Sequence, residues 1–112
     1  MKLKSDSIRS VFLDELERNK RLIDRYFKEL DKFPKGSVYM RKIGRQEYYY
    51  LNVREGVKVT GRFLGNVKTF DITTLKNQLA ERKRLEKLIK KLKTEQKELE
   101  KIIQALRINL NI

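Results

Sequence analysis

The sequence contains no cysteine and no histidine. Disulfide bonds, thiol nucleophiles, imidazole general bases and the common zinc sites are therefore excluded. Serine, tyrosine and carboxylate side chains remain, but none of them stands at a spacing typical of a catalytic site. We expect a protein that is not an enzyme and that uses no cofactor and no metal.

Long hydrophobic runs are also absent. The first residues, MKLKSDSIRS, lack the apolar segment of a signal peptide, and no stretch approaches the length that spans a membrane. We therefore predict a cytoplasmic protein without membrane association. The chain of 112 residues is long enough for one domain, which we expect to cover residues 1–112.

Acidic residues are few relative to basic ones. The chain has 28 Lys+Arg and 15 Asp+Glu, a formal net charge of +13. Such a surplus favours a polyanionic partner, although a lysine-rich composition without any anionic ligand is the alternative. The imbalance is greatest in residues 34–70, which carry eight basic and two acidic residues. We expect nucleic acid as the partner and this segment as the contact surface.

The periodicity of the apolar residues divides the chain into three segments. Over residues 7–33 they recur at spacings of three and four, typical of an amphipathic helix that ends before Pro34 and Gly36. Residues 37–65 alternate with period two and predict strands at about 37–43, 46–54 and 57–64, with tight turns at glycines. Residues 72–108 again have helical spacing. The predicted fold is α+β: an N-terminal helix, a three-stranded antiparallel sheet and a long C-terminal coiled-coil-like helix.

The C-terminal helix begins with recognisable signals. Asp71 can cap it, and Phe70 with Leu75 can form a hydrophobic staple. Its later apolar residues predict a helix interface at Leu85, Leu88, Leu92, Leu99, Ile102 and Leu106, broadened by Ile89 and Ile103. The earlier apolar residues are out of phase with this seam, so we expect the seam to change partner near residues 82–84, from the sheet to another helix. Two chains paired through the long helix are predicted, with a monomer whose helices pack on each other as the alternative.

The register of the sheet decides which side chains share a face. A turn at Gly44-Arg45 places Met40 opposite Tyr49 and Val38 opposite Leu51. For the second hairpin, a three-residue loop at residues 55–57 pairs apolar with apolar side chains and is therefore predicted. The buried face would then comprise Val38, Met40, Tyr49, Leu51, Val53, Val59 and Phe63.

The opposite face of the predicted sheet carries aromatic and basic residues. The candidate nucleic-acid-binding residues are Tyr39, Arg41, Tyr48, Tyr50, Arg54, Lys58 and Arg62. In this register Tyr50 lies beside Arg62, and Arg54 faces Lys58. Tyrosine rings can pack on sugars or bases while the cations hold phosphate oxygens. The same residues could instead stabilise the sheet alone, or anchor a protein partner.

A basic run in the last helix, residues 83–97, is a second zone of positive charge. It could flank a phosphate backbone, but such a run is more typical of the solvated side of a coiled coil.

The sheet segment also carries a resemblance. Residues 48–51, 54–56, 58–59 and 62–65 read YYYL, REG, KV and RFLG. This core, over about residues 46–65, resembles that of small uncharacterised prokaryotic and viral proteins in which a charged coiled-coil helix follows. It is also similar to the N-terminal DNA-contacting sheets of some transposases and tyrosine recombinases. The resemblance implies a phage or mobile-element association and favours DNA over RNA as the ligand.

These observations predict a small basic protein that binds nucleic acid without catalysis through the Tyr/Arg face of its sheet. The first alternative is a protein-interaction module that regulates or accompanies a nucleic-acid enzyme or ribonucleoprotein, such as a phage-encoded inhibitor or accessory subunit. The second alternative is a structural coiled-coil assembly factor.

Overall fold

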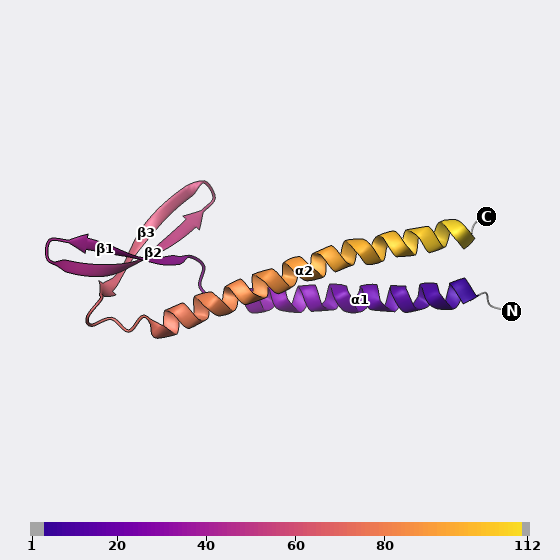
Figure 1. The fold of residues 1–112 in the computed structure, drawn as a ribbon, viewed down its shortest axis with the longest axis horizontal. Coiled ribbons are helices and arrows are strands. Elements are labelled where there is room, and N and C mark those ends of the chain that lie inside the picture. Colours follow the sequence, from indigo (N-terminus) through magenta and orange to yellow (C-terminus); the bar gives the residue numbers. More distant parts are fainter. Residues whose placement is uncertain (1–3, 111–112) are drawn as a thin grey trace. The chain divides into compact units, whose positions relative to one another are not determined.

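A computed structural model describes residues 4–110 of the chain, with side chains described for residues 7–106. Its elements are α1 (Lys4–Leu30), β1 (Ser37–Ile43), β2 (Gln46–Glu55), β3 (Lys58–Asn66) and α2 (Thr73–Leu110) (Figure 1). The predicted α+β fold and its element order are confirmed. α1 ends at Leu30, ahead of the predicted residue 33, because the residues before Pro34 leave helical geometry.

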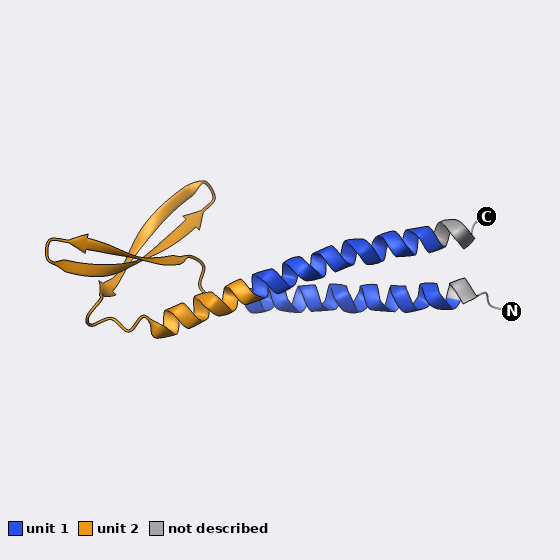
Figure 2. Ribbon diagram, in the orientation of Figure 1, with its two compact units in different colours: residues 1–30, 85–112 blue, residues 31–84 orange. Residues whose placement is uncertain are grey.

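The chain divides into two compact units (Figure 2). The helical unit comprises Met1–Leu30 and Leu85–Ile112, and the sheet unit comprises Asp31–Arg84. α2 contributes to both units, and the boundary between Arg84 and Leu85 agrees with the predicted change of partner along its apolar seam. Within residues 4–110, no helix is both long enough and apolar enough to cross a membrane.

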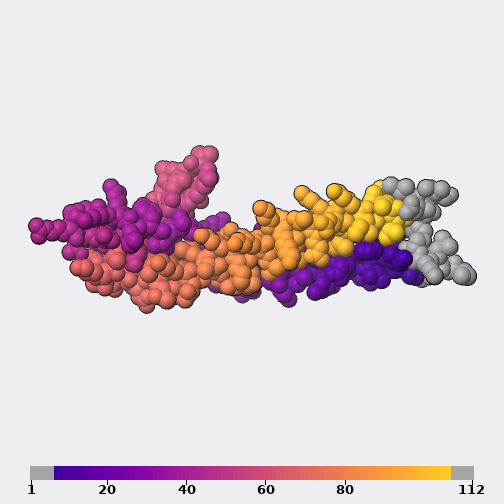
Figure 3. Space-filling view, in the orientation of Figure 1, coloured from indigo at the N-terminus to yellow at the C-terminus, as the bar shows by residue number. Residues whose placement is uncertain are grey.

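In the helical unit, α1 and the C-terminal part of α2 run antiparallel and lie along each other (Figures 1 and 3). The core is a single apolar seam in which the buried residues are Ile23, Leu30, Leu85, Ile89, Leu92, Leu99 and Ile103. Of the predicted interface residues, Leu88 and Leu106 are half-buried and Ile102 is exposed. Ile89 and Ile103 face α1 instead, each one position after a predicted interface residue, Leu88 or Ile102.

Asn19 is the polar exception within this seam. It is 2% exposed, and its amide nitrogen donates a hydrogen bond of 2.9 Å to the carbonyl oxygen of Leu92. A single buried amide among apolar residues favours the register that gives it a partner. Asn19 therefore aligns the two helices along their common axis.

In the sheet unit, the strands are antiparallel in the order β1–β2–β3. The first hairpin has the predicted register, with Met40 opposite Tyr49 and Val38 opposite Leu51. In the second hairpin the predicted three-residue loop is wrong. Glu55 pairs with Lys58, so the loop contains only Gly56 and Val57.

The local turn explains this outcome. Gly56 adopts a φ of 65°, as the first central position of a type II′ turn requires, and such two-residue turns match the twist of the flanking strands. Tyr50 consequently pairs with Phe63, and Leu51 with Arg62. A β-bulge follows, since Tyr49 pairs with Gly65 and one residue of β3 has no partner. The turn geometry therefore prevails over apolar cross-strand matching.

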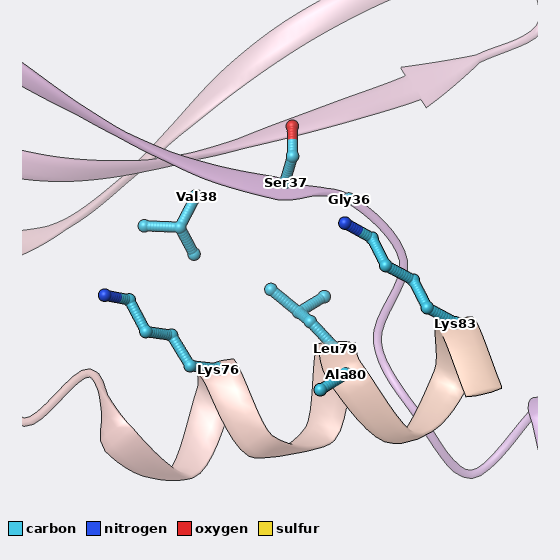
Figure 4. Close-up of a pocket in the computed structure, with 7 residues that line it drawn as sticks. All are labelled: Gly36, Ser37, Val38, Lys76, Leu79, Ala80 and Lys83. Carbon is cyan, nitrogen blue, oxygen red and sulfur yellow. The ribbon is translucent and has the colours of Figure 1, made fainter.

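One face of the sheet is covered by the first turns of α2. Leu79 is buried, and Figure 4 shows it and Val38 pointing toward each other across a hollow of about 260 Å³. Lys76 and Lys83 extend on either side of it (Figure 4). Leu51 is also buried on this face, at 6% exposure, whereas Met40, predicted to be buried there, is 59% exposed.

The start of α2 is capped as the sequence predicts. The backbone nitrogen of Thr73 donates a hydrogen bond of 3.0 Å to the Asp71 carboxylate, which satisfies one free donor of the first turn. Phe70, just before the cap, packs its ring against that of Tyr49, with centroids 6.3 Å apart. These contacts connect the helix start to the sheet.

The segment between α1 and β1 is held by a buried arginine and a close-packed glycine. Arg82 donates a hydrogen bond of 2.9 Å to the carbonyl oxygen of Phe33. Gly36 has a φ of 125°, and a Cβ atom there would lie 2.6 Å from the backbone oxygen of Asn52. A side chain at this position would push β1 away from β2.

We predict that Gly36→Ala destabilises the sheet unit by about 2 kcal/mol or more, because both the φ and the contact exclude a Cβ atom. Gly44→Ala is the control: its φ is also positive, at 65°, but nothing lies within 4 Å of the new Cβ atom, so a loss of only about 1 kcal/mol is expected. Urea unfolding followed by tyrosine fluorescence measures both variants. Equal losses would show that the close approach to Asn52 does not matter.

Candidate nucleic-acid interface

Four aromatic rings gather on the sheet face opposite Leu51. They belong to Tyr39 on β1, Tyr48 and Tyr50 on β2 and Phe63 on β3, and we call them the aromatic platform. The rings of Tyr39 and Tyr50 are stacked, with centroids 5.5 Å apart and planes inclined by 17°. Phe63 lies 5.6 Å from both Tyr48 and Tyr50. Such offset and edge-on contacts stabilise a cluster of rings beyond simple burial.

The platform follows from cross-strand pairing. Tyr39 pairs with Tyr50 and Tyr50 with Phe63, so these three side chains must point to the same side of the sheet. Gly61 leaves space for the ring of Tyr39. The hydroxyl end of Tyr39 occupies the space in which a Cβ atom of Gly61 would lie, so the Tyr39 ring extends across β2 to β3.

The platform is accessible. Phe63 is 58% exposed and Tyr39 is 39% exposed, while Tyr48 and Tyr50 are half-buried. Exposure of a phenylalanine to this extent is costly in water, because its ring has no polar atom to hydrate. A contiguous group of exposed apolar rings is typical of a binding surface.

Two exposed arginines lie on the same face. Arg41 pairs with Tyr48 at one end, and Arg54 pairs with Val59 toward the tip of the second hairpin. The Nε atom of Arg54 donates a hydrogen bond of 3.3 Å to the carbonyl oxygen of Gly56. Figure 3 shows this hairpin projecting from the rest of the sheet unit. The rings are thus accompanied by a cation at each end of the platform.

Two of the seven predicted binding residues lie elsewhere. Lys58 pairs with Glu55 and Arg62 with Leu51, so both point to the face opposite the platform. The prediction that Tyr50 lies beside Arg62 is therefore wrong, and so is the prediction that Arg54 faces Lys58. The remaining five, Tyr39, Arg41, Tyr48, Tyr50 and Arg54, share one face.

The prediction that Phe63 and Val59 lie on the buried face is wrong, because they pair with Tyr50 and Arg54 on the platform side. The sequence of the second turn contains the signal that predicts the correct face for both residues. Gly56-Val57 has the same Gly-X form as Gly44-Arg45, and a type II′ turn there gives the observed register. The prediction instead paired apolar residues with apolar residues across the strands, which required a three-residue loop.

No group of three or more Asp and Glu residues within residues 4–110 is arranged to hold a metal ion. Comparison of the chain with family models, with curated proteins and with solved structures finds no match.

We predict that Gly61→Ala displaces the Tyr39 ring from Tyr50, because the new methyl group takes the place of the hydroxyl. Combining it with Tyr39→Phe removes the hydroxyl and should restore the stacked pair. Ring-to-ring nuclear Overhauser effects, with near-ultraviolet circular dichroism as a second probe, report the arrangement. If Gly61→Ala leaves the ring contacts intact, Tyr39 does not lie over Gly61.

Proposed function

We propose that this protein binds nucleic acid without catalysing a reaction, and that the aromatic platform with Arg41 and Arg54 forms the contact. The observation that carries the proposal is the group of accessible rings on one sheet face, with an exposed arginine at either end. Rings supply stacking surface for bases and sugars, and guanidinium groups pair with phosphate oxygens in a bidentate way.

The charge of the sheet unit supports this choice of partner. Residues 31–84 contain thirteen basic and five acidic residues. A field of this sign attracts a phosphate backbone and accelerates its association. Most of this charge is not in the platform itself, so we expect it to contribute affinity that does not depend on sequence.

The kind of nucleic acid and its biological setting come from the resemblance of residues 46–65. On that basis DNA is favoured over RNA, and a phage or mobile-element setting is proposed. The lack of cysteine and histidine supports a role in binding over one in catalysis.

A protein partner is the alternative to nucleic acid at this surface. Tyrosine and arginine are also the residues that most often anchor protein interfaces. A protein of a nucleic-acid-processing complex could therefore contact the same rings. Weak dependence of binding on salt would favour this alternative, since release of counterions makes nucleic-acid binding fall steeply as salt rises.

We propose, in addition, a homodimer formed through the helical unit. Four apolar residues each lie one position before a residue of the seam: Val11, Leu22, Leu88 and Ile102 precede the half-buried Phe12 and the buried Ile23, Ile89 and Ile103. Charged residues, Arg18, Lys91 and Glu98, stand between them at the equivalent positions. In an antiparallel helix pair, these positions fall on the same side of both helices. The opposite side, one position after the core, carries charges such as Lys20, Asp24, Lys90 and Lys93.

A second copy fits the apolar side because a two-fold axis brings identical stripes together, as in a four-helix bundle. Val11 and Ile102 are 65% and 39% exposed in one chain, so a copy would remove apolar surface from water. A dimer would also present two sheets to one nucleic acid and raise the effective concentration of the second.

To test nucleic-acid binding, we compare two double variants that remove equal charge from opposite faces of the sheet. Arg41→Ala with Arg54→Ala should weaken binding at least tenfold at moderate salt, whereas Lys58→Ala with Arg62→Ala should weaken it much less. Fluorescence anisotropy of labelled single-stranded DNA, duplex DNA and RNA, each at several salt concentrations, measures this. Equal losses would mean that only the overall charge matters. Binding by none of the three would refute the proposed function.

To test the dimer, we introduce Val11→Glu and Ile102→Glu on the apolar side and Lys93→Glu on the charged side as a control. The first two should produce monomers, because a buried carboxylate without a partner costs several kcal/mol. The third should remain dimeric. Light scattering coupled to size-exclusion chromatography gives the mass. A monomeric wild-type protein would reject the dimer.

A further inference from the structure

We propose that the aromatic platform is built for single-stranded nucleic acid, with unpaired bases stacked on Phe63 and Tyr39. This inference rests on the proposed function and names the class of ligand that the same surface takes. It depends on which rings are exposed, how they are held and where the cations lie around them.

Phe63 carries most of the inference. It is the most exposed ring of the platform, at 58%, and it has no hydrogen-bond donor or acceptor. In a duplex the faces of the bases are covered by their neighbours, so a protein meets phosphates, sugars and base edges. An exposed phenylalanine can hydrogen-bond to none of these and makes only apolar contact with a sugar or a thymine methyl group, whereas an unpaired base offers its whole face for stacking.

The other rings hold Phe63 without covering it. Tyr48 is tilted by 49° and Tyr50 by 78° relative to Phe63, both at 5.6 Å between centroids. Contacts at these angles hold the ring in place while 58% of the residue stays exposed. A ring that is already fixed loses little conformational entropy when a base stacks on it.

Tyr39 offers a second ring of this kind. It lies nearly parallel to Tyr50, with planes inclined by 17°, and it remains 39% exposed. Tyr39 and Phe63 come from the two strands that flank β2, and both rings contact Tyr50, at 5.5 Å and 5.6 Å between centroids. The platform therefore offers two exposed rings on which bases can stack.

The cations are arranged along the strand direction. Arg41 lies opposite Tyr48 and Arg54 lies six residues further along β2, a separation of roughly 20 Å at 3.3 Å per residue. Asn52 lies between them on the same face and supplies an amide that can pair with a base edge. A single nucleic-acid strand running along β2 would meet an arginine, two rings, an amide and a second arginine.

Duplex DNA would require another surface of the same sheet. A two-stranded β-ribbon can enter the major groove, where hydrogen-bonding side chains read base edges. On the β2–β3 hairpin, the polar residues Lys58, Thr60 and Arg62 point away from the platform. A duplex held through those residues is the competing outcome, and the experiment separates it from the proposal.

The experiment compares an oligothymidylate of about twelve nucleotides, within the usual range of site sizes, with a blunt duplex of equal length and an oligouridylate. Binding is followed by anisotropy and by quenching of intrinsic tyrosine fluorescence, which is informative because the chain has five tyrosines and no tryptophan. The variants are Phe63→Leu, which keeps an apolar side chain without a ring, and two controls. Val59→Ala removes an exposed apolar residue from the same face, and Arg62→Ala alters the opposite face.

We expect the oligothymidylate to bind at least tenfold more tightly than the duplex. Phe63→Leu should lose about 5- to 150-fold, the effect of one stacked base, without change in the salt dependence. Arg41→Ala should instead make the salt dependence shallower, since it removes a phosphate contact. Val59→Ala and Arg62→Ala should remain close to wild type. The oligouridylate shows whether the ribose hydroxyl adds to or subtracts from binding.

Equal or tighter binding of the duplex would overturn this inference while leaving the proposed function intact. The inference would equally be overturned if Phe63→Leu lost no more than Val59→Ala, or if Arg62→Ala lost the most. Lack of salt-dependent binding to all three probes would instead remove the proposed function itself. Unchanged circular dichroism of Phe63→Leu shows that any loss is not due to unfolding.

Discussion

The two-residue turn at Gly56-Val57 determines the chemistry of both faces of the sheet. Side chains alternate strictly along a strand, so a shift of one residue in the pairing of β2 with β3 exchanges every β3 side chain between the faces. The observed turn assigns Phe63 and Val59 to the face of Tyr39 and Tyr50, and it assigns Lys58 and Arg62 to the other. The platform exists because this turn has two residues and not three.

The two faces of the sheet differ in their exposure to solvent. Leu51 is buried on the side where Leu79 of α2 lies, and the aromatic platform on the opposite side remains accessible. The platform is nevertheless ordered by its own contacts, because each of its rings lies within 5.6 Å of a neighbouring ring. Gly61 completes it by leaving space for the Tyr39 hydroxyl. A surface of this kind is organised before any ligand arrives, which lowers the entropic cost of binding.

The helical unit depends on a polar contact within an apolar seam. The hydrogen bond from Asn19 to the Leu92 carbonyl oxygen favours the alignment of the two helices that the structure shows. Once this alignment is set, Ile89 and Ile103 face α1, while Leu88 and Ile102 fall on the flank. Leu88 and Ile102 then belong to the side of the helix pair to which we propose that a second copy of the chain binds.

The limits of β3 differ from the predicted residues 57–64, but the sequence alone predicts the element order, the limits of β1, the first hairpin, the helix cap at Asp71 and the change of seam near Arg84. Each of these follows from signals within a few residues: periodicity, glycine and proline positions, or a single side chain beside a backbone donor. The same signals placed five of the seven predicted binding residues on one face. The sequence did not settle whether Phe63 is buried, which of two leucine–isoleucine alternations faces α1, or which helix covers the sheet. Those outcomes were decided by tertiary structure, because they depend on competition between a local turn and cross-strand packing, and on contacts between residues such as Asn19 and Leu92 that are distant in the chain.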